Sequence, residues 1–164
     1  MSNAIPFRMN YSVPGDLTRM AGLDKVKAEA YGATAIPAYG VPVKLAAANG
    51  GILPISTQAD TVYGILVRPF PYQQNSTTGS QSVAVPLTSG IAQVLLSGYV
   101  GVVCNVGTPV EGGQVYVWTA ATGGGHTQGG IEATAVGGSN FAIPNCYFTG
   151  PMDASNNVEI AFNI

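Results

Sequence analysis

Histidine and cysteine, the residue types most often used in catalysis and metal binding, are scarce in this chain of 164 residues. The one histidine, His126, lies in the run GGGHTQGG, whose glycines predict a mobile, exposed loop tip. A Ser-His-Asp triad needs an imidazole that a second group holds rigidly, so this context does not favour catalysis. Cys104 and Cys146 belong to no CxxC pattern. They exclude a usual zinc site and predict two small, buried thiols in a reducing compartment.

The acidic and aromatic residues give no catalytic pattern either. Asp60, Glu111, Glu132 and Glu159 are scattered over expected turns and strands, and no two have a spacing that marks a glycosidase pair. The glycines of residues 121–130 lead into the strand-like IEATAV, whereas a phosphate-binding loop leads into a helix. A carbohydrate-binding surface stays an alternative, because aromatic side chains can stack on sugar rings, although aromatic residues lie more often in the core or in an interface. The candidates for such a surface are Tyr63, Phe70, Tyr72, Tyr116 and Trp118. We therefore expect no enzyme activity, no metal and no cofactor.

The composition excludes further classes of protein. Six basic and eight acidic residues, with no basic run, argue against binding to nucleic acid. Apolar residues make up 46% of the chain, yet its best candidate for a membrane span, Ile91–Val106, is too short and is interrupted by polar residues. The N-terminus lacks the apolar core of a signal peptide, so secretion is not indicated. An apolar chain with so few charges is expected to cover part of its surface in an assembly.

From residue 36 onward the strong patterns are those of β-strands. In VEIAFNI, Val158, Ile160, Phe162 and Ile164 alternate with residues of the other face. Three further runs are apolar on both faces, so both faces should be covered: residues 61–68, 93–106 and 114–120. Turn-forming clusters separate the runs, at 49–51, 75–80, 107–113, 121–130, 137–140 and 153–157. This pattern predicts an all-β fold, a small antiparallel β-barrel or sandwich.

The first 35 residues differ from the rest, since they hold half of the charged side chains. The stretch LDKVKAEAY (residues 23–31) predicts one short helix that begins near Asp24, and the prolines on either side favour extended chain. We expect residues 1–35 to form an extended N-terminal arm with at most one short helix, and residues 36–164 to form the barrel or sandwich domain. The alternative is an ordinary N-terminal strand and loop of that same domain.

Two stretches, YGVPVKL (39–45) and GGILPISTQADTVYGILVRPFPYQ (50–73), resemble the structural cement proteins that decorate the capsids of tailed bacteriophages. The matching residues are Gly40, Val41, Pro42, Val43, Tyr63, Gly64, Val67, Arg68, Pro69 and Pro71. PGDLTR (14–19) resembles the arm of that family, and residues 148–164 resemble its closing strand.

The resemblance implies a protein made in the host cytoplasm that sits in many copies on the outer capsid surface of the virion and bridges neighbouring capsid subunits. Its partners would be the major capsid protein and further copies of itself, as a dimer or trimer. Because aromatic and arginine side chains dominate interface energies, we expect the arm to supply the contacts: Phe7, Arg8, Met9, Tyr11, Leu17, Arg19 and Met20. Arg68 would form an interface ion pair or lie in solvent at a strand end. A phage tail or fibre component and a carbohydrate-binding β module are the alternatives.

Overall fold

The computed structural model describes residues 13–19, 24–47, 50–69 and 85–164, and every element that it shows there is a β-strand. The strands are β1 (Lys25–Ala30), β2 (Pro42–Leu45), β3 (Ile52–Pro54), β4 (Gly64–Val67), β5 (Ile91–Val106), β6 (Gln114–Trp118), β7 (Ile131–Glu132), β8 (Asn140–Phe148) and β9 (Asn157–Phe162). The prediction of an all-β fold is confirmed.

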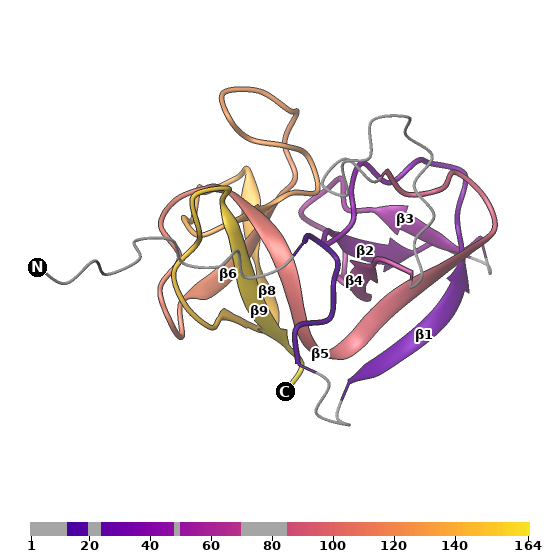
Figure 1. The fold of residues 1–164 in the computed structure, drawn as a ribbon. Coiled ribbons are helices and arrows are strands. Elements are labelled where there is room, and N and C mark those ends of the chain that lie inside the picture. Colours follow the sequence, from indigo (N-terminus) through magenta and orange to yellow (C-terminus); the bar gives the residue numbers. More distant parts are fainter. Residues whose placement is uncertain (1–12, 20–23, 48–49, 70–84) are drawn as a thin grey trace, which may run out of the picture.

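Strand β5 is 16 residues long and belongs to two rings of strands, which appear as two lobes in Figure 1. Its first half pairs with β1 on one edge and β4 on the other, and β2 and β3 continue the sheet from β4. Tyr31, directly after β1, bridges to Ile52 in β3 and closes this first barrel. The second half of β5 pairs with β9 and β7, and β8 and β6 link those two strands into the second barrel. All pairings between the named strands are antiparallel except that of β5 with β7.

Each barrel has its own core, and β4 separates the two. The first barrel is filled by one apolar cluster that includes Val43, Ile52, Leu66 and Val94. A larger cluster fills the second barrel and includes Val102, Val117, Ile143, Phe148 and Ile160. In β4, Leu66 belongs to the first cluster, whereas its neighbours Ile65 and Val67 belong to the second. The two faces of β4 thus contact two different cores, which explains why the sequence of this strand is apolar on both faces.

The short helix predicted within residues 23–31 is wrong, because Lys25–Ala30 forms β1. The strand pairs antiparallel with β5, with Val26 opposite Leu95 and Ala30 opposite Ile91. An isolated helix of this length is marginal in water, whereas pairing with β5 satisfies the backbone groups along one whole edge. The predicted boundary at residue 35 falls in the loop between β1 and β2, and the division into arm and domain stays a prediction.

Candidate functional site

The described part of the arm, Val13–Arg19, lies along β5 in the gap between β1 and β7. Leu17 forms an antiparallel bridge with Val100. The Gly15 N–H donates to the Gly101 carbonyl at 2.8 Å, and the Gly101 N–H donates to the Asp16 carbonyl at 3.0 Å. These bonds satisfy the stretch of β5 that neither neighbouring strand reaches. The arm is therefore fastened to the seam between the two barrels through its backbone.

Three backbone segments meet at this seam, and two glycines allow the contact. Gly15 has a φ of +88°, and a Cβ there would lie 2.6 Å from the Tyr39 Cβ. The Arg68 N–H donates to the Gly15 carbonyl at 2.8 Å. Gly40 has a φ of +76°, and a Cβ there would lie 2.9 Å from the Gly101 carbonyl oxygen. The segments that carry the family resemblance, PGDLTR, YGVPVKL and the end of β4, thus come together in space.

Arg68 lies inside this junction. Its side chain is only 8% exposed, its Nε lies 3.7 Å from Asp16 Oδ1, and its guanidinium lies 5.8 Å from the centre of the Tyr39 ring. Burial raises the pKa of Asp16, and the positive charge of Arg68 opposes that rise. The structure therefore places Arg68 in an ion pair within its own chain, an arrangement that neither of the two sequence interpretations included.

Arg19, at the end of the described arm segment, partners a carboxylate of β9. Its Nε and Nη2 lie 3.2 Å and 2.5 Å from the two carboxylate oxygens of Glu159, and its guanidinium lies 4.3 Å from the centre of the Tyr99 ring. Thr149 Oγ1 also donates to Glu159, at 2.7 Å. Burial alone would raise the pKa of Glu159, but these hydrogen bonds lower it overall. Because the Arg19 side chain is 51% exposed, one part of it neutralises a buried charge while the rest faces solvent.

The predicted contact residues fall into two groups. Leu17, Arg19 and Arg68 are brought together around the seam, where Leu17 packs against the core of the second barrel. Phe7, Arg8, Met9, Tyr11 and Met20 lie outside the described residues. Contact of either group with a partner protein stays a prediction. Sequence reasoning missed the partners Asp16 and Glu159, and the glycine of PGD was the one local sign that this segment packs closely.

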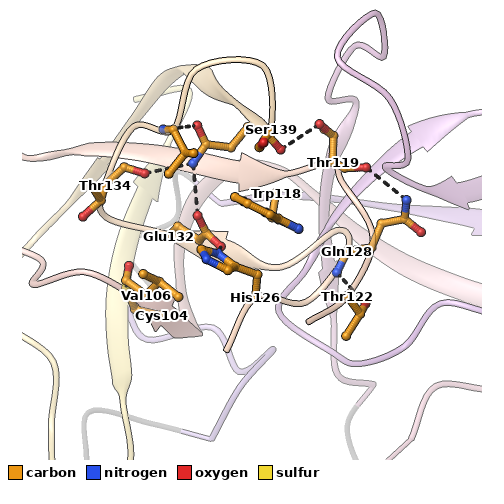
Figure 2. A network of polar contacts seen from close by, with 12 residues as sticks. Cys104, Val106, Trp118, Thr119, Thr122, His126, Gln128, Glu132, Thr134 and Ser139 are labelled. Carbon is orange, nitrogen blue, oxygen red and sulfur yellow. Dashed lines mark hydrogen bonds and ion pairs between the residues drawn. The ribbon is translucent and has the colours of Figure 1, made fainter. Parts of the chain in front are cut away.

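His126 lies in a second cluster of polar side chains (Figure 2), where its ring is partly covered and not at the exposed loop tip that the sequence predicted. Its Nδ1 lies 2.6 Å from Oε1 of Glu132, a fully buried carboxylate, and its ring stacks on Trp118 with 3.8 Å between centroids. Asn140 Nδ2 donates to the other carboxylate oxygen of Glu132 at 3.0 Å. The imidazole is thus held on two sides. Trp118 is only 8% exposed and has one face covered, so it is not an open platform for a sugar ring.

Both cysteines are free and buried, as predicted. Burial raises the pKa of Cys104 to about 11 and that of Cys146 still further. Within the described ranges, no three His, Cys, Asp or Glu side chains gather to hold a metal ion. In the same ranges, no helix is long and apolar enough to span a membrane.

Comparisons with known proteins were made for the whole chain. The family model of the XM1 gp53 minor capsid protein matches residues 1–162. Among solved structures, a chain in the capsid of Myoviridae phage XM1 is similar, with a TM-score of 0.67, 19% identity, and coverage of 99% of this chain and 97% of that one. At this identity the likeness shows a shared fold. No curated protein matches the chain.

Proposed function

Since the chain belongs to the XM1 gp53 minor capsid protein family, which makes it a structural protein of the virion capsid, we propose that it is a decoration, or cement, protein. It binds the outer surface of the closed shell and bridges neighbouring capsid subunits. It is made in the host cytoplasm and joins the shell from outside. The observation that carries this proposal is the two-barrel body built on one shared strand.

A body of this form suits bridging because it offers two separate surfaces in a fixed relation. The first barrel exposes large apolar side chains at Leu45 and Ile91, and the second exposes Tyr147. Apolar surface at both ends allows contact with two neighbours at once. Two modest contacts made by one rigid body act together as a much tighter one. Binding only to the closed shell then stabilises that shell by mass action.

The arm is the part of the chain that we assign to capsid contact. Its fastening at the seam sets residue 13 between the two barrels, so the preceding residues start from a fixed point. Of these, Phe7, Arg8, Met9 and Tyr11 have the aromatic, arginine and apolar character of interface anchors. The exposed part of Arg19 and the following Met20 would extend the same contact.

We also propose that copies of the chain associate with one another on the shell. The alternative of a tail or fibre component finds no support in a family that is named for the capsid. The alternative of a carbohydrate-binding module is weakened, because the His126 ring stacks on Trp118 and covers the face that would contact a sugar.

The test is binding of the purified chain to closed, expanded capsids that lack it, measured by co-sedimentation. We expect the full chain to saturate these capsids and a variant lacking residues 1–12 to lose most of its occupancy. The matched control is the unfolding temperature of both proteins, which shows whether the deletion leaves the body folded. Equal occupancy of a folded variant would contradict the role of the arm. Absence of binding by the full chain would contradict the proposed function itself.

A further inference from the structure

Two tyrosines and an arginine of the arm meet on the outer face of the second barrel. Strand β9 lies between β5 and β8 (Figure 1), and Ala161 of β9 is directly opposite Tyr99 on one side and Tyr147 on the other. Residues opposite one another in an antiparallel sheet direct their side chains to the same face. Since Ile160, next to Ala161, belongs to the core, this row faces outward. Arg19 completes it, because its guanidinium lies 4.3 Å from the centre of the Tyr99 ring, and the three side chains are called the tyrosine patch below.

The tyrosine patch is exposed, and its arginine is held in place before any partner binds. The Arg19 side chain is 51% exposed, and Tyr147 is 36% exposed. Glu159 and the Tyr99 ring hold the guanidinium from two sides, so little side-chain freedom is left to lose on binding. The hydrogen bond to Glu159 is the main cause that raises the pKa of Arg19, and Tyr99 and Tyr147 act in the same direction. Exposed arginine and tyrosine side chains that are fixed in this way are typical of the centre of an interface.

The tyrosine patch offers a partner more hydrogen-bond donors than acceptors. Its one carboxylate, Glu159, already accepts from Arg19 Nε, Arg19 Nη2 and Thr149 Oγ1. These bonds use only some of the N–H groups of the guanidinium. Within the described part of the chain, neither Arg19 Nη1 nor the hydroxyls of Tyr99 and Tyr147 have a hydrogen-bond partner. A protein surface that covers the patch must therefore supply acceptors, because donors left unpaired in an interface cost binding free energy.

We propose that the tyrosine patch binds an acidic side chain, an aspartate or a glutamate, on the capsid subunit that the second barrel contacts. A carboxylate offers acceptors only, and it is the group that a guanidinium binds most favourably. The exposed side chains that the first barrel offers, Leu45 and Ile91, are apolar, so the two ends of the body would contact surfaces of different chemistry. The inference rests on the proposed capsid binding and deepens it, because it names the chemistry of the partner surface.

The first test compares two charged variants at Tyr147. Tyr147→Glu and Tyr147→Lys remove the same exposed ring and introduce opposite charges, and co-sedimentation over a range of chain concentrations gives their affinity for closed, expanded capsids that lack the protein. We expect Tyr147→Glu to bind roughly tenfold or more weakly than Tyr147→Lys, because it sets a like charge against the acidic partner. The matched control is the same pair of changes at Ala135, an exposed residue in the loop between β7 and β8, where the two charges should give nearly equal affinities.

The outcomes separate this inference from the proposed function. Unfolding temperatures show that the variants keep a folded body. If the native chain binds but the two Tyr147 variants bind equally well, or if Tyr147→Lys is the weaker of the two, the partner group is not acidic and the inference is wrong, while the proposed function stands. If the native chain does not bind closed capsids, the proposed function fails and the inference fails with it.

The second test removes a single donor and leaves the ring in place. Tyr147→Phe lacks only the hydroxyl, and we expect it to lower the affinity for capsids by roughly two- to tenfold through the lost hydrogen bond. Tyr116→Phe is the matched control, because Tyr116 is a half-buried tyrosine of β6 outside the patch, and its affinity should equal that of the native chain. Native affinity of Tyr147→Phe, or an equal loss in both variants, would contradict the role of the Tyr147 hydroxyl as a donor to the partner.

Discussion

The fold requires a glycine at position 15. Its φ of +88° is unfavourable for any residue with a side chain, and a Cβ would lie 2.6 Å from the Tyr39 Cβ. We predict that Gly15→Ala lowers the free energy of unfolding by about 2–4 kcal/mol, measured by urea denaturation. Gly112→Ala is the matched control, because Gly112 has a φ of +74° but open space around it, and should cost only about 1 kcal/mol. Equal costs at the two positions would mean that the seam is not tightly packed.

The charge of the Asp60 carboxylate contributes to the stability of the folded protein. It accepts hydrogen bonds from Lys44 Nζ, the Ser56 N–H and the Thr57 N–H, at 2.8, 2.8 and 2.9 Å. Burial alone would raise the pKa of Asp60, but these bonds lower it well below its usual 3.8. The stability that Asp60 contributes is therefore fully present above pH 3.8 and is lost as the pH falls below that value.

We predict that Asp60→Asn is less stable than the native chain at pH 7 and that its stability changes less between pH 5 and pH 2. Urea denaturation across this pH range checks both parts. Parallel pH profiles for the two proteins would show that Asp60 does not hold the low pKa that the geometry requires.

At the scale of elements, sequence patterns predicted the strands with strongly apolar positions and failed where the choice depended on distant partners. Val158, Ile160 and Phe162 are buried as predicted, but Glu159 and Ala161 on the other face of β9 are buried too, and Ile164 lies beyond the end of β9 and is 49% exposed. The lysine, alanine and glutamate residues of β1 favour a helix locally, and pairing with β5 overrides that preference.

The sharing of one strand by two barrels could not be read from the sequence, because no local pattern records which strands pair with each half of β5. The setting of His126 escaped prediction for a related reason. Its partner Glu132 is fully buried, and burial of a carboxylate follows from the tertiary fold and not from neighbouring residues. At the seam, the glycine of PGD gave a sign of close packing, but the partners Asp16 and Glu159 gave none.

The docked segment of the arm gives a test at the same scale. Removing residues 1–19 instead of 1–12 deletes the partner of the Gly101 N–H and leaves the buried Glu159 without Arg19. We predict that the longer deletion is less stable than the shorter one by about 2–4 kcal/mol, again by urea denaturation. Equal unfolding free energies would show that Val13–Arg19 does not help to hold β5 in place.

At the scale of the whole molecule, β5 ties two barrels into one body, and the arm is fastened where they join. A force on either barrel passes through a shared strand and, at β4, through side chains that belong to both cores. A cement protein needs this property, because contacts with two neighbours hold a shell together only when the body between them does not yield.

The central claim is that the protein binds the closed shell from outside and stabilises it. The most direct measurement takes particles that lack the protein, adds the purified chain, and follows both the bound amount relative to the major capsid protein and the temperature at which the shell breaks open. We predict saturable binding, with a breakage temperature that rises in step with occupancy. Failure of the chain to bind closed shells from outside, or saturation that leaves the breakage temperature unchanged, would contradict the account.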